Sequence, residues 1–288
     1  MTTPDLENFQ LKRSYIKKDI EYIYVPHDVN SSNLTFHKNA LDHFDTIFAS
    51  GRKNKEEIQE REEKFELKKK NIVEWGSSVI DNMTVAYAEM EKNKGDKPTV
   101  LIAPSWQKDN ILDSCIENIL DELKGQDYNL IVRPHPQYVR HFEGRIDALI
   151  EKYKADGIVV QKDFSSNSTV YTADLLVTDW SSIAYEYAFS TLKPVLFINT
   201  PMKVVNPDYK ELDSVPIDIE LRDKVGISLE EDQMNKVKDA VNELLNNNRF
   251  APDAMEKLRD DYIYNVGQSG KVGAKYIIDR LVLLTKKK

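Results

Sequence analysis

The sequence predicts an α/β fold in which parallel β-sheets carry helices on both faces. The first observation is that, from residue 99 onward, short apolar runs of the strand type alternate with longer runs whose apolar residues have helical spacing. The second is that strand-type runs such as Leu175–Thr178 are apolar almost throughout, as in strands that helices cover on both faces. This alternation is typical of parallel sheets, because a helix carries the chain back to the start of the next strand.

The first 95 residues contain fewer elements than the remainder of the chain. We predict strands at Ile20–Val25, Thr46–Ala49 and Ile72–Trp75, and helical segments at Leu41–Phe44 and Lys55–Phe65. Three strands are few for a complete doubly wound domain, so an incomplete N-terminal domain is expected over residues 1–95.

The polar segment Lys92–Pro98 holds the predicted boundary, and residues 96–288 form the second predicted domain. Its predicted strands are Thr99–Ala103, Asn129–Val132, Gly157–Val160, Leu175–Thr178 and Pro194–Ile198. Its predicted helices are Ile111–Leu123, Phe142–Tyr153, Ser181–Phe189, Glu230–Leu245, Pro252–Tyr262 and Lys271–Leu284.

The composition argues against several classes of protein. The net charge is −8, whereas binding to nucleic acid by counterion release needs a broad basic face. No apolar run approaches the roughly 20 residues that span a bilayer, and residues 1–14 lack the apolar core of a signal peptide. Cys115 is the only cysteine, which excludes an intrachain disulfide and indicates a small buried hydrophobe. We therefore expect a cytoplasmic protein without a nucleic-acid partner.

Basic residues nevertheless gather near the start of the chain (12, 13, 17 and 18), at Lys68–Lys70 and at Lys286–Lys288. Such groups can hold a protein at an anionic membrane surface. Short charge runs are more often solvated loops and helix ends, and this is the favoured interpretation. Peripheral attachment to the inner face of the cell membrane stays open beside it.

Arg133-Pro134-His135-Pro136 directly follows a predicted buried strand. Ligands of open α/β sheets bind beyond the carboxyl ends of the strands. The two prolines stiffen the turn, and the imidazole of His135 can donate a hydrogen bond to a phosphate oxygen. A loop histidine that only caps backbone groups is an equal alternative.

Residues 178–182 follow another strand and begin a helix. A helix N-terminus with free N–H groups and small hydroxyl side chains binds anions and suits a diphosphate, which indicates Ser181 and Ser182. Plain N-capping by Asp179 or either serine is the alternative. Glu186 lies one turn further on the face of Ser182, where a carboxylate can accept hydrogen bonds from ribose hydroxyls.

His27 and Asp28 follow a strand of the first half. A histidine at a strand end can act as a general base. His37 and His43 are six residues apart and would lie on different helix faces, so no metal is expected. The sequence also has no GxGxxG, Walker A or GxSxG motif, so a phosphate grip here would use helix ends and side chains, and no cofactor is expected.

Taken together, four blocks of the chain resemble the CDP-glycerol glycerophosphotransferase family, which includes primases and polymerases of wall teichoic acid and related capsule enzymes. The blocks are Tyr22–Gly51, Leu101–Gln107, Arg133–Pro136 and Ala173–Asn199. The resemblance implies a GT-B fold, in which two Rossmann-like domains with parallel sheets face each other across a cleft. Residues 1–95 would be the acceptor-side domain, apparently incomplete, and residues 96–288 the donor domain.

The resemblance also implies roles for individual residues. His135 would contact the donor phosphates, Ser181 and Ser182 the diphosphate, and Glu186 the ribose. His27 would deprotonate the acceptor hydroxyl for attack on the β-phosphorus, and CMP would leave. The further candidates are Arg133 and Asp179 on the donor side, with Asp28, Ser105, Trp106 and Lys193 as additional site residues.

The implied function is the transfer of glycerol phosphate from CDP-glycerol to a teichoic-acid-like or capsular polymer or a lipid-linked acceptor. Some positions depart from the family pattern: Asp28 stands where the family has Gly, and Gln107 stands where it has Arg. Two alternatives therefore stay open. One is a GT-B glycosyltransferase or capsule polymerase that uses another nucleotide-activated alditol or sugar, and the other is an inactive nucleotide-binding module.

Family N-domains carry several strands before the strand that precedes His27, and few residues precede it here. We expect the chain to be the C-terminal part of a longer protein or a naturally short form. Sheet edges exposed in a short domain need covering, so a homo-oligomer is among the expected partners.

Overall fold

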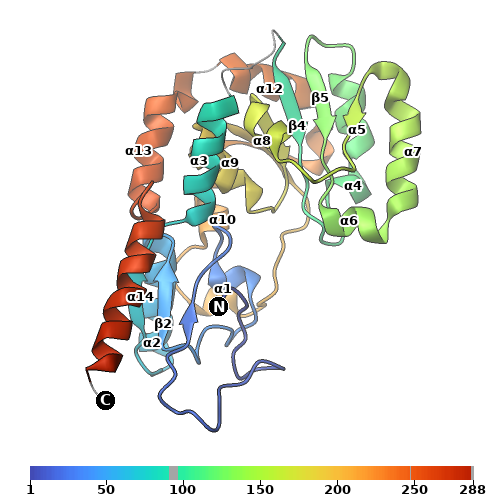
Figure 1. Cartoon of the computed structure of the whole chain (residues 1–288). Helices are drawn as coiled ribbons and strands as arrows, with labels where there is room; N and C mark the ends of the chain where they lie inside the picture. Colours follow the sequence, from blue (N-terminus) through green and yellow to red (C-terminus); the bar gives the residue numbers. More distant parts are fainter. Residues whose placement is uncertain (91–96, 247, 287–288) are drawn as a thin grey trace. The chain divides into compact units, whose positions relative to one another are not determined.

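The computed structural model describes residues 1–90, 97–246 and 248–286 of the chain, which forms two compact units (Figure 1). Unit 1 comprises Met1–Asn82, Val204–Ile219 and Lys257–Lys288, and unit 2 comprises Met83–Lys203 and Glu220–Glu256. The predicted boundary at residues 95–96, within the segment Lys92–Pro98, lies outside the described residues, so the division into 1–95 and 96–288 stays a prediction. The units differ from those ranges, because the first division falls between Asn82 and Met83 and two later segments of the chain fold into unit 1.

Unit 2 contains a six-stranded sheet in the order β6-β5-β4-β7-β8-β9, and every neighbouring pair is parallel. The strands are β4 (Thr99–Ile102), β5 (Asn129–Val132), β6 (Val159–Val160), β7 (Leu175–Thr178), β8 (Val195–Asn199) and β9 (Gly226–Glu230). The first five confirm predicted strands. Their burial explains the continuous apolar runs, because β7 and the first four residues of β8 are buried throughout.

Strand β9 was not predicted. It lies at the edge of the sheet, and only Gly226 and Leu229 of its five residues are buried, so its apolar signal is weak. Gly226 is needed there because a Cβ at this position would lie 1.7 Å from the carbonyl oxygen of Val195 on the neighbouring strand.

The strand order reverses between β4 and β7. The chain builds β5 and β6 outward on one side of β4, then returns to build β7, β8 and β9 on the other side. This is the strand order of a Rossmann fold, and its reversal marks the place where ligands of open α/β sheets bind. The loops that follow β4 and β7 meet at this point, and both carry predicted site residues.

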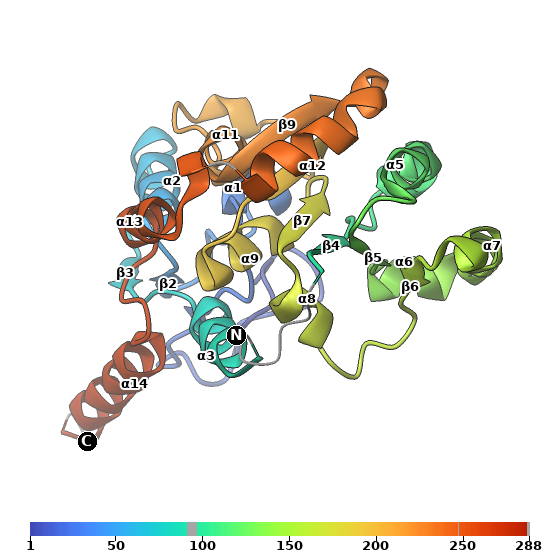
Figure 2. The same ribbon diagram turned by 90° about the horizontal axis from the view of Figure 1, so that it is seen from above.

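Helices connect the strands of unit 2. Figure 2 shows α12 beside β9 at one end of the sheet and α7 beside β6 at the other. The helices are α4 (Ile111–Ser114), α5 (Ile116–Leu123), α6 (Pro136–His141), α7 (Glu143–Tyr153), α8 (Ser168–Thr172), α9 (Ile183–Thr191), α11 (Arg222–Val225) and α12 (Val237–Asn246). Short 3₁₀ segments lie at Lys154–Asp156, Glu231–Lys236 and Asn248–Phe250.

Two predicted helices differ in detail from those observed. The predicted helix Ile111–Leu123 is broken at Cys115, whose φ of −138° is not helical. Burial of Cys115 is confirmed, and desolvation raises the pKa of its thiol to about 11. The helix predicted to begin at Glu230 begins later, at Val237. Glu230 instead ends β9 and forms a capping box with Gln233 at the start of the 3₁₀ segment.

Unit 1 contains a three-stranded parallel sheet in the order β1-β2-β3. Its strands β1 (Ile23–Tyr24), β2 (Thr46–Ala49) and β3 (Asn71–Glu74) confirm the three that were predicted. Its helices are α1 (Ser32–Thr35), α2 (Arg52–Lys64) and α14 (Ser269–Thr285), with a 3₁₀ segment at Tyr209–Glu211. Helices α3 (Ser78–Met90), α10 (Ile217–Glu220) and α13 (Pro252–Tyr262) lie where the chain passes from one unit to the other.

The helix predicted at Leu41–Phe44 is wrong, because this segment forms turns. Its apolar residues are buried for another reason. Leu41 and Phe44 pack into the core of unit 1 with Leu6, Tyr24 and Ile47. The two apolar residues therefore have a helical spacing because both are buried in the same core, although the segment is not a helix.

Helix α14 packs on unit 1 through one face. The Tyr276 ring makes an edge contact with Phe48 at 5.5 Å between centroids, and Nε of Arg280 lies 2.7 Å from Oε2 of Glu21. Apolar side chains are exposed towards its end, at Ile277, Ile278, Leu281, Val282, Leu283 and Leu284. Within the described ranges, no helix has both the length and the apolar character needed to cross a membrane.

Candidate functional site

The Asp179 carboxylate joins the two loops at the point where the strand order reverses. Asp179 is fully buried directly after β7. Its Oδ1 accepts hydrogen bonds from the backbone N–H groups of Ser105 at 2.8 Å and Trp180 at 2.7 Å, and its Oδ2 accepts one from Ile111 at 3.2 Å. One side chain therefore fixes the loop after β4, the start of α4 and the loop after β7.

Burial raises the pKa of Asp179, and the three backbone hydrogen bonds act against this shift because they stabilise the carboxylate. The carboxylate has no exposed surface with which to meet a ligand. The structure thus places this predicted donor-side residue beneath the loops, where it positions them.

Arg222 supports the same region and was missed by the sequence analysis. It is 6% exposed, and its guanidinium lies over the rings of Trp180 and Phe197, with Cζ 4.0 and 4.3 Å from the centroids. It donates hydrogen bonds to the backbone oxygen of Asp179 at 3.0 Å and to Oδ1 of Asn199 at 2.7 Å. It therefore ties the ends of β7 and β8 together. The local sequence LRDKVG gives no sign of this role.

Ser181 and Ser182 lie at the N-terminus of α9, as predicted from the strand–helix junction. Ser182 is the N-cap, and its carbonyl oxygen accepts hydrogen bonds from the N–H groups of Tyr185 and Glu186. Both serines are half-buried. Glu186 lies in the first turn and is 9% exposed, so it is a nearly buried carboxyl group.

His135 takes the capping role that the sequence left open, and this leaves its other ring nitrogen unused by the cap. It is the N-cap of α6, and its Nδ1 accepts a hydrogen bond from the N–H of Gln137 at 3.1 Å. In the neutral ring the proton is then on Nε2, which can donate to a ligand oxygen. Burial first, and then the positive charge of Lys203, lower the pKa of His135, which favours this neutral donor at pH 7. The ring stacks on the half-exposed Trp106, with centroids 5.9 Å apart and an interplanar angle of 26°.

The Arg133 guanidinium organises the loop that follows β6. It donates hydrogen bonds to Oε1 of Gln161 at 2.9 Å, to the backbone oxygen of Ser166 at 3.0 Å and to Oδ1 of Asn167 at 2.7 Å. Its donors are thus directed at the protein. Ser105, another predicted site residue, is buried at 3% exposure and takes part through its backbone N–H.

Lys193 does not join these residues. It precedes β8, and its Nζ donates to the backbone oxygen of Ala173 at 2.7 Å, before β7. In a parallel sheet, residues that precede strands lie at the opposite edge from residues that follow them. The structure therefore places Lys193 at the amino edge of the sheet and Ser181 and Ser182 at the carboxyl edge.

His27 lies after β1 in unit 1, as predicted. Its side chain is 58% exposed, and its Nε2 lies 3.8 Å from Oδ2 of Asp28. His37 and His43 are also exposed; the His37 ring contacts Phe9, and the backbone oxygen of His43 accepts a hydrogen bond from Arg13. Across the described parts of the chain, no three His, Cys, Asp or Glu side chains are grouped as metal ligands.

A cavity of unit 2, about 460 Å³, is lined by other residues. It opens between α4, α5 and α7 and is lined by Asp113, Glu117, Arg145 and Lys152, none of which is a predicted site residue. Arg145 is paired with Asp113, and Lys152 with Glu117. The candidate site is therefore identified by its position in the sheet and its donor groups, and this cavity is no part of it.

Comparison with known proteins identifies the kind of chain to which this site belongs. A family model described as CDP-glycerol:poly(glycerophosphate) glycerophosphotransferase matches residues 25–205. A teichoic acid glycerol-phosphate primase from Bacillus subtilis (strain 168) is 27% identical over 150 residues, which is 49% of this chain and 36% of the primase. The aligned part thus spans little more than a third of that relative.

Solved structures show the same fold. The wall teichoic acid polymerase TagF superposes with a TM-score of 0.56 at 16% identity, covering 94% of this chain and 70% of the polymerase. The UDP-GlcNAc 2-epimerase of Methanocaldococcus jannaschii has a TM-score of 0.52 at 15% identity, covering 82% and 61%. The predicted α/β, GT-B-like fold with parallel sheets is confirmed.

Replacing Asp179 by Asn tests the anchor at the strand reversal. Asparagine keeps an acceptor oxygen for Ser105 and Trp180 but presents N–H₂ to the N–H of Ile111. We expect D179N to lower the free energy of unfolding by about 1–3 kcal/mol, since a buried donor loses its acceptor. Asp156→Asn, on the exposed 3₁₀ segment Lys154–Asp156, is the control and should change it by less than about 0.5 kcal/mol. Equal stability of the two variants in urea denaturation would contradict the anchoring role.

Proposed function

This chain belongs to the CDP-glycerol:poly(glycerophosphate) glycerophosphotransferase family, and from this premise we propose that it transfers glycerol phosphate from CDP-glycerol to an acceptor. The acceptor would be a teichoic-acid-like or capsular polymer, or a lipid-linked precursor of one. The observation that carries the proposal is the span of the family match, residues 25–205, which includes His27 and the loops after β4, β5 and β7.

The donor side of the proposal rests on the carboxyl edge of the unit 2 sheet. The Nε2–H of neutral His135 donates to a phosphate oxygen, and the N-terminus of α9 with Ser181 and Ser182 receives the diphosphate. Glu186, in the first turn of the same helix, is the proposed acceptor for ribose hydroxyls. Trp106, stacked on His135, shields that hydrogen bond from water on one side.

For the chemical step, we assign His27 as the general base. It takes the proton of the acceptor hydroxyl while that oxygen attacks the β-phosphorus of CDP-glycerol. The new O–P bond forms, the bond to the bridging oxygen breaks, and CMP leaves with the electron pair. The exposed imidazole is compatible with access by a bulky acceptor.

A peripheral membrane surface is proposed for unit 1. Helix α14 exposes Ile278 at 58% and Leu281 at 57%; Lys275 lies on the same helix, and Lys286 is its C-cap. Apolar side chains beside basic ones suit an anionic lipid interface. Such a surface would bring the enzyme to a lipid-linked acceptor.

Donor binding is tested by a thermal-shift series with CDP-glycerol, CDP-ribitol and UDP-sugars. We expect CDP-glycerol to stabilise the unmodified protein. In H135Q and S182A its Kd should rise about tenfold, which is a loss of about 1.4 kcal/mol in binding free energy. His141→Ala, on the exposed side of α6, is the control and should bind normally. Because the pKa of His135 is lowered, the affinity should be nearly constant from pH 7 to 8 and rise only in acid, where imidazolium forms. If only UDP-sugars stabilise the protein, the donor is a UDP-sugar, and the assignment of CDP-glycerol is wrong.

The base assignment is tested by CMP release with and without acceptor. We expect His27→Ala to lower kcat by about 10²–10⁴-fold, the usual contribution of general-base catalysis, with donor affinity unchanged. His43→Ala, also exposed in unit 1, should retain turnover. Normal turnover in H27A would remove His27 from the mechanism, and donor binding without any turnover in the unmodified chain would favour an inactive nucleotide-binding module.

The membrane surface is tested by co-sedimentation with vesicles that contain phosphatidylglycerol. We expect the double variant I278D/L281D to lose most of the bound fraction, because two charges would enter the lipid interface. Val85→Asp changes a 62% exposed side chain on α3 and serves as the control. Equal binding of both variants would exclude α14 as the contact.

A further inference from the structure

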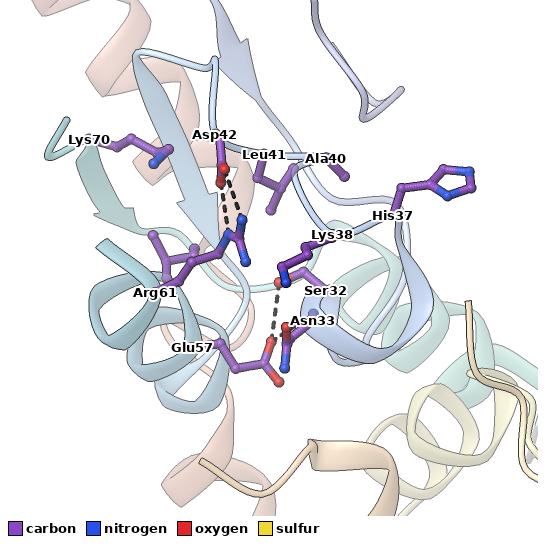
Figure 3. Close-up of a pocket in the computed structure, with 11 residues that line it drawn as sticks. Ser32, Asn33, His37, Lys38, Ala40, Leu41, Asp42, Glu57, Arg61 and Lys70 are labelled. Atoms are coloured by element: carbon purple, nitrogen blue, oxygen red, sulfur yellow. Dashed lines mark hydrogen bonds and ion pairs between the residues drawn. The ribbon is translucent and has the colours of Figure 1, made fainter. Parts of the chain in front are cut away.

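A buried carboxyl group of unit 1 has no part in the proposed reaction. Glu57 lies midway along α2 and is 2% exposed. Figure 3 shows its side chain pointing from α2 towards Ser32 and Asn33 at the start of α1. A buried carboxyl group is costly unless hydrogen bonds satisfy it, so its partners indicate what the fold gains from it.

All three hydrogen bonds given to Glu57 come from consecutive residues. The Ser31 hydroxyl donates to Oε1, the Ser32 hydroxyl donates to Oε2 at 3.1 Å, and the Asn33 N–H donates to Oε2 at 3.3 Å. Ser31 is itself fully buried and is the N-cap of α1, accepting the N–H of Leu34 at 3.1 Å. Glu57 therefore holds the first turn of α1 and its cap.

A second carboxylate holds the same serine from another part of the chain. Oδ2 of Asp218, on α10, accepts the N–H of Ser31 at 2.7 Å. Ser31 thus donates its N–H to one buried acidic side chain, Asp218, and its O–H to another, Glu57. Asn206, in the same returning segment, donates from Nδ2 to the backbone oxygen of Asn33 at 2.9 Å.

Helix α2 also reaches the residues between Ser31 and His27. Nδ2 of Asn54, three residues before Glu57, donates to the backbone oxygen of Asn30 at 3.0 Å. Nδ2 of Asn30 in turn donates to Oδ2 of Asp28 at 2.8 Å, and this same oxygen lies 3.8 Å from Nε2 of His27. Contacts therefore run without a gap from α2 to the histidine.

We infer that Glu57 is a positioning residue for His27, acting through the backbone of residues 28–33. The inference rests on the role proposed for His27. The His27 side chain is mostly exposed, so the placement of its ring depends on the course of the loop that carries it. That loop leaves β1 and must end at Ser31, which Glu57 and Asp218 fix. A displacement of about 1 Å at a reacting group can cost about 10²-fold in rate, so this anchor matters to turnover as well as to folding.

The protonation state of Glu57 guides the choice of variant. Burial raises the pKa of Glu57 to about 7, and the charge of Asp218 adds to the rise, while the hydrogen bonds from Ser31, Asn33 and Ser32 oppose it. Glutamine therefore resembles the protonated form and keeps one acceptor oxygen. Alanine removes the anchor altogether, and Glu63→Ala, on the exposed side of α2, is the matched control.

The first measurement needs no turnover. In the whole 288-residue chain, we expect E57A to raise the amide hydrogen-exchange rates of residues 31–34 by about tenfold or more and to shift the NMR ring signals of His27. E57Q should show smaller changes of the same kind, and E63A none. Should E57A fail to fold, E57Q carries the comparison. Exchange rates and His27 signals that match those of E63A would overturn the inference.

The second measurement separates positioning of His27 from general loss of structure. We expect E57A to lower kcat for CMP release by about 10–100-fold while KM for CDP-glycerol changes less than about twofold. In the double variant H27A/E57A, the second change should cost little beyond H27A alone, because the anchored group is gone. If the fold-losses in kcat of H27A and E57A multiply in the double variant, the inference is overturned. If the unmodified chain releases no CMP, the proposed function fails, and the exchange and NMR data still decide whether Glu57 positions the loop.

Discussion

The hydrogen bonds that the Asp179 carboxylate accepts from three backbone N–H groups are the constraint on which the candidate donor site depends. The strand order of unit 2 reverses at β4 and β7, so the connections that leave these strands run to opposite sides of the sheet. One buried carboxylate joins both loops to the start of α4. Arg222 adds two hydrogen bonds, which it donates to the backbone oxygen of Asp179 and to the side chain of Asn199 at the end of β8. The serines at α9, and Trp106 with its stacking contact to His135, lie on loops that are fixed in this way.

In unit 1, a loop that carries a candidate site residue is likewise held by buried carboxylates. The loop after β1 is held by the buried Glu57 and Asp218, which accept the donors of Ser31 and its two successors. Both candidate loops are therefore anchored by acidic side chains that accept hydrogen bonds from the chain itself. The sequence has ten glycines but no glycine-rich phosphate loop. Loops without such a motif need side chains to hold their backbone, and buried carboxylates do so because they accept several hydrogen bonds at once.

Membership of the glycerophosphotransferase family and the GT-B-like fold leave the substrates to the details of the loops, because a fold by itself does not specify a reaction. From the sequence, two positions were expected to depart from the family pattern. Asp28 lies beside His27, and its carboxylate accepts a hydrogen bond from Asn30. Gln107 donates to the backbone oxygen of Pro201 and so joins the loops after β4 and β8. Both departures therefore have structural roles in this chain.

The sequence by itself determined the parallel α/β architecture, eight of the nine strands in the described residues, the family, and the strand ends at which polar residues gather. Apolar runs that must be buried and the turns between them are local signals, so they can be read without the fold. Only the tertiary structure decided which of the gathered residues are buried and which groups of the protein they bind. An aspartate after a strand can meet a ligand or anchor a loop, and the full burial of Asp179 makes it an anchor. Arg222 and Glu57 gave no local signal, because their partners are far away in the sequence. Strand β9 was missed since an edge strand buries only part of its surface. Burial and long-range hydrogen bonds are properties of the folded chain, and they separate residues that build the site from residues that can meet a substrate.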